Sequence, residues 1–371
     1  MLRNVSFSLI ATAISISTWA QAPADTTKPA APAPPALSIT GSADMYYRYD
    51  FNRPTAGSNS YTSFTQTHDQ AQLGMATVKL EHKTAKMDMV ADLGFGKRAQ
   101  DFDYADYAPP LGTGGGGILQ AVKQLYISYS PASWIKFTGG TWATHIGYEV
   151  VDAYANRNYS MSYMFTNGPF SHTGLRADLT SGKNGFMIGV SNPTDYRTIP
   201  AGGQSNKNLI AQYSYAASDN FHLYLNYVGG RDIVDNKVHQ YDLVINSKLS
   251  STFGIGANGT FNRTDIKSGD AFIGHSWYGA AAYLLLDPKP WFGLTLREEY
   301  FSDKDAVKLP AIAGAGGNVF ASTLTASFKV DGFTFMPEFR LDNANYEIFA
   351  KHDGTTTKTD ASFLIAAVYS F

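Results

Sequence analysis

Cysteine is absent from the 371 residues, which excludes disulfide frameworks, thiol catalysis and thiolate metal sites. Charge is also scarce: Asp, Glu, Lys and Arg make up 16% of the chain, against about 25% in soluble domains. The net charge of −2 gives a nucleic-acid partner no electrostatic basis. No stretch approaches the ~18 consecutive apolar residues of a membrane-spanning helix. A helical membrane protein is therefore excluded, whereas a membrane β-barrel is not, because its strands average to mild polarity.

The N-terminus has the three parts of an export signal. Arg3 supplies a positive charge, residues 5–16 are apolar, and a small-residue cleavage site ends at Ala22. The stretch that follows is rich in proline and alanine, a composition typical of an extended tether that cannot pack. We therefore predict a signal peptide at 1–22, a tether at 23–36 and one folded domain at 37–371.

From residue 37 onward, polar and apolar side chains alternate along segments of about ten residues, the pattern of strands with two unlike faces. In 238–249, for example, Tyr241 and Leu243 fall on one face and Asp242 and Asn246 on the other. Pro337 removes a ladder hydrogen bond, so we expect a bulge there. The predicted strands lie near 37–51, 69–82, 86–98, 118–130, 134–148, 172–181, 185–192, 207–217, 220–230, 238–249, 252–263, 275–286, 290–301, 318–329, 332–342 and 359–371.

The predicted connections alternate along the chain between long and short. The long ones are 52–68, 99–117, 149–171, 193–206, 231–237, 264–274, 302–317 and 343–358. The short turns that separate them are 83–85, 131–133, 182–184, 218–219, 250–251, 287–289 and 330–331. Outer-membrane barrels have this asymmetry of tight periplasmic turns and long external loops. In lipid a sheet must close so that every backbone group is paired. The sequence thus predicts an all-β fold: a transmembrane antiparallel β-barrel of about sixteen strands in a bacterial outer membrane.

A barrel of this strand number leaves an aqueous channel. Its apolar face meets outer-membrane lipid, and its last strand ends in the aromatic residue Phe371, which looks like the C-terminal signal recognised by the barrel-assembly machinery. The predicted function is passive diffusion of small hydrophilic solutes, with no cofactor and no nucleic-acid partner. The alternative is an adhesin or ligand-binding receptor that acts through the external loops, and homo-oligomers remain open.

A set of charged residues falls on the polar faces of the strands. Each would be costly against lipid, up to ~2–4 kcal/mol for a cation at the bilayer midplane. We therefore expect them to line the water-filled lumen and tune which solutes pass; the alternative is general solvation without selectivity. Their signs are too balanced to name an ion preference. They are Asp44, Arg48, Asp88, Asp92, Arg176, Asp178, Asp242, Lys248, Arg297, Glu299, Glu338 and Arg340.

The connection 149–171 is the longest and is rich in aromatic residues that an outer surface would solvate poorly. We expect it to fold inward against the barrel wall and narrow the channel, with Glu149, Asp152 and Arg157 near the constriction. The alternatives are a loop that covers the mouth or packs on a neighbouring subunit.

Catalytic and metal sites are not predicted. The histidines show no HExxH spacing and no tight ligand cluster. Ser171 and His172, like His275 and Ser276, are strand neighbours that face opposite sides. A third alternative, a barrel-embedded hydrolase, therefore has no residue constellation behind it. The expectation is that the chain is not an enzyme.

Four aromatic-rich motifs resemble those of the β-barrel porins called OmpL-like, found in outer membranes of Bacteroidetes-type bacteria. They occur in consistent order as GSADMYYRYDFN, KQLYISYSP, GGTWATHIGYE and NYSMSYMFTNGPFSHTGLRA, and the likeness spans about Leu37 to Phe371. The resemblance implies an outer-membrane barrel with porin function and supplies no catalytic residues. Likeness to general sixteen-stranded porins is confined to strand count and the position of the inward loop.

Overall fold

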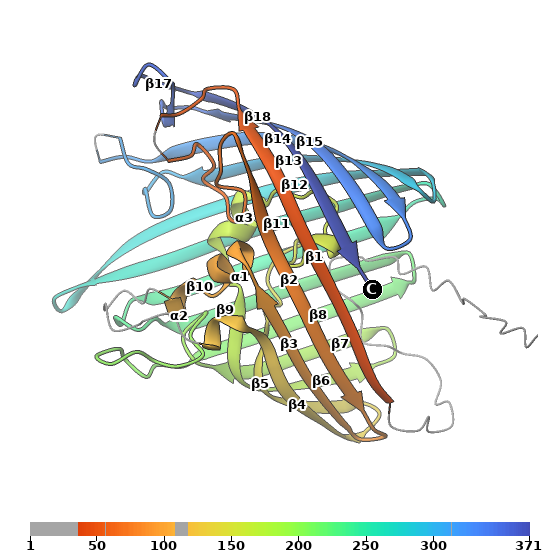
Figure 1. Ribbon diagram of the computed structural model, residues 1–371. Coiled ribbons are helices and arrows are strands. Elements are labelled where there is room, and N and C mark those ends of the chain that lie inside the picture. The colour runs from red at the N-terminus through yellow and green to blue at the C-terminus, as the bar shows by residue number, and fades with distance from the viewer. Residues whose placement is uncertain (1–35, 56, 108–117, 313) are drawn as a thin grey trace, which may run out of the picture.

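The computed structural model describes residues 36–55, 57–107, 118–312 and 314–371. The predicted signal peptide and all but the last residue of the predicted tether lie outside the described residues. Sixteen strands form one closed antiparallel barrel, in which each strand pairs with its sequence neighbours and β18 closes on β1 (Figure 1). The predicted fold class is confirmed.

The barrel strands are β1 (Ala36–Asp50), β2 (Gln70–Lys83), β3 (Met87–Phe95), β4 (Val122–Ala132), β5 (Ile135–Ala143), β6 (Ser171–Ser181), β7 (Asn184–Ser191), β8 (Asn208–Ser218), β9 (Phe221–Arg231), β10 (Lys237–Lys248), β11 (Phe253–Ser268), β12 (Ala271–Lys289), β13 (Phe292–Asp303), β14 (Gly317–Val330), β15 (Phe333–Ala344) and β18 (Thr359–Ser370). The loops hold α1 (Lys97–Phe102), α2 (Tyr104–Tyr107), α3 (Tyr163–Asn167), the 3-10 helices η1 (Ile118–Ala121) and η2 (Ala153–Ala155), and the short hairpin of β16 (Phe349–Ala350) and β17 (Thr356–Thr357). None of the described helices is long and apolar enough to cross a membrane.

The alternation along each strand separates an outer apolar face from an inner polar one. On β10, Tyr241 is 53% exposed on the outer face, whereas its neighbour Asp242 is 6% exposed on the inner face. The start of β1 and the end of β18 lie at the rim that carries the short turns (Figure 1). There Ala36 pairs with Lys83, and the Phe371 N–H donates to the Gly41 carbonyl. Closure therefore pairs the edges that an open sheet would leave unsatisfied in lipid.

Two predicted connections are wrong. Strands β11 and β12 continue through 264–274 and meet in a tight turn, where Ser268 pairs with Ala271 and Gly269 takes φ +61°. Glycine adopts this left-handed conformation without steric cost, which suits a two-residue hairpin. The predicted turn at 287–289 also belongs to β12, which ends at Lys289. Backbone pairing thus extends further than the side-chain alternation indicated.

Two further predictions fail within strands. Pro337 causes no bulge, because Thr325 pairs with Glu338 and Phe328 with Phe335 in one unbroken register. Strand β3 ends at Phe95, earlier than predicted, so Arg98 lies in α1 instead of on the barrel wall. The positive φ of Gly96, 121°, marks the departure from the strand.

Candidate functional site: a loop bound inside the barrel

Residues 144–170, which connect β5 to β6, are here called the lumen loop. Its centre is buried: Tyr159, Met161 and Tyr163 each have 0% exposure. Helix α3 begins after Ser162, whose Oγ accepts a hydrogen bond from the Phe165 N–H (3.0 Å), as expected of a serine N-cap. This local turn presents the backbone N–H groups on either side of it to the barrel wall.

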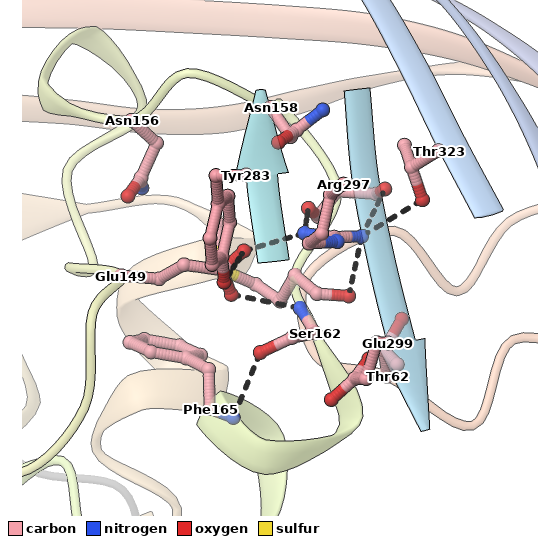
Figure 2. Close-up of polar contacts among 12 residues, drawn as sticks. Thr62, Glu149, Asn156, Asn158, Ser162, Phe165, Tyr283, Arg297, Glu299 and Thr323 are labelled. Atoms are coloured by element: carbon pink, nitrogen blue, oxygen red, sulfur yellow. Dashed lines mark hydrogen bonds and ion pairs between the residues drawn. The ribbon is translucent and has the colours of Figure 1, made fainter. Parts of the chain in front are cut away.

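An arginine on β13 ties the two arms of the lumen loop together. Arg297 Nη1 lies 2.5 Å from Glu149 Oε1 and 2.7 Å from the Ser160 carbonyl oxygen (Figure 2). Its Nη2 donates to Thr323 Oγ1 at 3.1 Å. The Glu149 carboxylate in turn accepts the Ser162 N–H at 2.8 Å. Arg297 has 0% exposure, and the partners that loop and wall give its two terminal nitrogens offset part of the desolvation penalty of this buried ion pair.

Two wall carboxylates bind the loop backbone directly. Glu338 accepts the N–H groups of Tyr159 and Ser160 at 2.8 and 3.1 Å. Glu299 accepts those of Tyr163 and Met164, both at 2.8 Å. The N–H groups of Tyr163 and Met164 lie in the first turn of α3, where a helix offers them no carbonyl partner. The Glu299 carboxylate on the barrel wall therefore caps this helix. Charge-assisted bonds of this kind are roughly twice as strong as neutral ones.

Two loop tyrosines extend the same interface. Tyr159 Oη donates to Asp44 (2.5 Å) and Tyr163 Oη to Asp342 (2.9 Å). Burial, followed by the negative charge of Asp342, raises the pKa of Tyr163 well above its usual range. The hydroxyl therefore stays protonated and remains a donor. Arg340 links the same carboxylate to the loop: it donates to Asp342 at 2.8 Å and to the Met161 carbonyl at 2.7 Å.

The first arm of the loop is held by ion pairs on other strands. Lys123 of β4 lies 2.6 Å from Asp152 and 3.2 Å from Asp92. Arg157 binds Asp287 of β12 with both terminal nitrogens, at 2.8 and 2.6 Å. All three residues predicted for the constriction, Glu149, Asp152 and Arg157, thus pair with the wall.

The predicted lumen charges divide by exposure. Most are buried, in contact with loops or other wall residues, so the expectation that each lines water does not hold for them: Asp44, Arg48, Asp92, Asp242, Arg297, Glu299, Glu338 and Arg340. Groups of the lumen loop replace water as partners for most of them, whereas Asp92 binds Lys123 and Gln124 of the wall. Arg48 instead donates to the Thr67 carbonyl of the first long loop (2.9 Å). Asp88, Arg176 and Asp178 are half-buried, and Lys248 is exposed.

Two parts of the inner wall follow from this division. The covered sector consists of Arg297, Glu299, Thr323, Thr325, Glu338 and Arg340 on β13, β14 and β15, all buried. The open sector consists of Gln124, Tyr126, Arg176, Asp178, Gln212 and Ser214 on β4, β6 and β8, all half-buried. In the open sector Arg176 and Asp178 pair with each other (3.3 Å) instead of with the loop.

Several anchoring residues could not be singled out from the sequence. Lys123 and Arg98 are both buried cations, and Arg98 lies 3.8 Å from Asp44 with its guanidinium over the Phe64 and Tyr159 rings. Nothing in the local pattern distinguishes either from a solvated lysine or arginine. The aromatic composition of the loop was the one usable clue, because it implied a buried surface.

The family comparison agrees with this architecture. A model of the family described as "Putative beta-barrel porin-2, OmpL-like" matches residues 36–371. The chain belongs to this porin family. It is an outer-membrane porin channel, as the resemblance implied. No curated protein matches the sequence.

Solved outer-membrane proteins share the fold at low sequence identity. The outer membrane channel DcaP of Acinetobacter baumannii is 12% identical (TM-score 0.61; 91% of this chain and 97% of that one covered). The anion-selective porin from Comamonas acidovorans is 8% identical (TM-score 0.60; 91% and 100%). OmpT of Vibrio cholerae in its trimer form is 9% identical (TM-score 0.55; 91% and 99%). At these identities the likeness concerns the fold alone.

In the described part of the chain, no group of three or more His, Asp or Glu side chains is arranged to hold a metal ion. The polar groups of the interior instead bind one another and the lumen loop. The family is one of β-barrel porins.

Proposed function

We propose that this porin passes small hydrophilic solutes by passive diffusion along the open sector, with the lumen loop as the opposite wall of the path. The supporting observation is the division of the inner wall. Charged side chains that contact the loop are buried and paired, whereas Arg176 and Asp178 are half-buried. Water can reach side chains only where the loop does not cover them.

Solute passage in this proposal requires no cofactor, because the gradient drives it and the protein supplies a wet route. The loop narrows the route, and its anchors keep the width fixed: the Arg297 and Glu149 pair and the two carboxylates Glu299 and Glu338 bind it at separate points. Rigid anchoring implies a steady conductance without large gating movements of the loop. The open-sector pair Arg176 and Asp178 would contribute opposed charges along the path.

Three partner relations belong to the same proposal. The apolar outer face contacts outer-membrane lipid, and the exposed ring of Phe371 serves the barrel-assembly machinery. Homo-oligomers are compatible with the fold, since OmpT is described in a trimer form. The export signal at 1–22 delivers the chain to the periplasm.

The test is planar-bilayer conductance of the refolded protein with and without residues 152–165. The intact chain should show steady open-channel current, and the deletion should raise it because the narrowing segment is gone. A deletion that inserts but conducts no better would contradict the constriction. The double variant Glu299→Gln/Glu338→Gln, which weakens the anchors while keeping the loop, should give noisier and larger currents.

The adhesin or receptor alternative makes the opposite prediction. A barrel that acts through its external loops needs no continuous path and should be nearly silent in the bilayer. Silence of the intact chain, together with current from the deletion, would indicate a plug instead of a porin.

A further inference from the structure

A cavity of about 470 Å³ opens at the short-turn end of the barrel, beneath the lumen loop. One wall is the loop itself around Arg157, and the other is formed by the ends of β10, β11, β12, β14 and β15 with the turn at 250–252. We call this cavity the basic vestibule. It lies beside the loop at the short-turn end of the barrel, which the path along the open sector must also reach.

The charges that line the vestibule are strongly unbalanced. Arg157, Lys248, Lys289 and Lys329 carry positive charge, and Asp287 is the sole carboxylate among the lining residues. Asp287 is already committed to Arg157 through the two-pronged pair. All three lysines line the cavity and are exposed.

Lysines from three separate strands converge here. Lys248 ends β10, Lys289 ends β12 and Lys329 lies near the end of β14. Lys248 and Lys329 both lie close enough to Asp287 to interact with its charge. Hydroxyl groups of the turn 250–252, together with Ser327 and Thr334, complete a lining that can donate hydrogen bonds to an anion.

The inner wall across the barrel does not offset this charge. Its partly exposed ionisable residues on β2, β3, β5 and β6 are matched in sign and several are paired. They are Lys79, Lys136 and Arg176 against Glu81, Asp88 and Asp178. These six charges are equal in number of each sign, so they do not offset the excess of cations in the vestibule.

We propose that the basic vestibule is an anion-binding antechamber that makes this porin prefer small anions, such as chloride, phosphate and carboxylates, over cations. The inference rests on the proposed diffusion function and adds the solute class. A cleft lined by one sign of charge within low-dielectric walls focuses the field and raises the local concentration of the opposite ion. Exposed lysines bind such ions weakly enough to release them, as conduction requires.

The test is the zero-current potential of the refolded porin across an asymmetric KCl gradient. The wild-type protein should pass chloride in preference to potassium. The double variant Lys248→Glu/Lys329→Glu leaves two cations against three carboxylates in the vestibule and should shift the permeability ratio several-fold toward potassium. The matched control Lys86→Glu/Lys183→Glu changes exposed lysines at other short turns, outside the cavity, and should leave the ratio near the wild-type value.

The outcomes separate this inference from the function on which it rests. A conducting wild-type channel that prefers potassium, or a double variant with wild-type selectivity, overturns the vestibule proposal and leaves the porin function intact. A silent wild-type chain contradicts the diffusion function itself. If the charge-reversed variant does not refold, Lys248→Gln/Lys329→Gln should show a smaller shift in the same direction.

Discussion

The covered and open sectors of the inner wall have similar residues and opposite roles. Arg297 and Arg176 are both arginines on the polar face of a strand, yet Arg297 is 0% exposed and binds the lumen loop, whereas the Arg176 side chain is 21% exposed and pairs with Asp178 on its own strand. The difference lies in what faces them. A polar inner face is therefore a necessary condition for a pore lining, but the neighbouring loop decides whether the charge meets water.

The covered sector also explains how a loop can be held inside a barrel. The backbone N–H groups of the lumen loop lose their water partners when the loop enters the barrel, and each buried donor left without an acceptor costs about 1–3 kcal/mol. Glu299 and Glu338 supply acceptors for four of these donors. These hydrogen bonds thus offset the desolvation cost of the loop's N–H groups and also that of the two buried wall carboxylates.

The largest contrast should appear when each arginine is replaced by methionine. Arg297→Met leaves the buried Glu149 without its cation, and we expect a loss of about 3–5 kcal/mol in the free energy of unfolding. Arg176→Met breaks a partly exposed pair and should cost about 1 kcal/mol or less. Urea unfolding in detergent micelles, followed by tryptophan fluorescence, measures both. Equal losses would remove the distinction between the sectors.

A smaller effect should follow from a single hydroxyl of the lumen loop. Tyr163→Phe removes the donor to Asp342 and leaves that buried carboxylate one bond short, so we expect a loss of about 1–3 kcal/mol. Tyr154→Phe is the matched control, because Tyr154 lies in the same loop and is 43% exposed. The same unfolding assay applies. A control as destabilised as Tyr163→Phe would show that loop tyrosines act by packing alone.

Much of the barrel could be predicted because its physics is local. The period-two alternation on β10, with Tyr241 out and Asp242 in, is visible in the sequence and requires no knowledge of the partner strand. One kind of error arose where backbone pairing between strands continues beyond the residues whose side chains alternate, as near the tight turn at Gly269. The other arose where a single glycine turns the chain out of the strand, as at Gly96 before Arg98. Backbone conformation at a single residue leaves little trace in hydrophobic pattern.

The site was less predictable because it depends on contacts between distant residues. The sequence identifies Glu299, Glu338 and Arg340 as inward-facing, but not that Tyr159 to Met164 would bind them. Likewise, the lysines of the basic vestibule lie at the ends of β10, β12 and β14, and their convergence follows only from the barrel's closure and the path of the loop. The roles of these residues in conduction stay predictions.

Cysteine accessibility tests the division of the lumen most directly, because the native chain has no cysteine to interfere. Ser214→Cys places a thiol in the open sector and Thr323→Cys one in the covered sector, where Thr323 has 0% exposure. A hydrophilic thiol reagent added to channels in a planar bilayer should react with the first variant and lower its current, and should leave the second unchanged. Rapid block of Thr323→Cys, or inertness of Ser214→Cys in a conducting channel, would contradict the account.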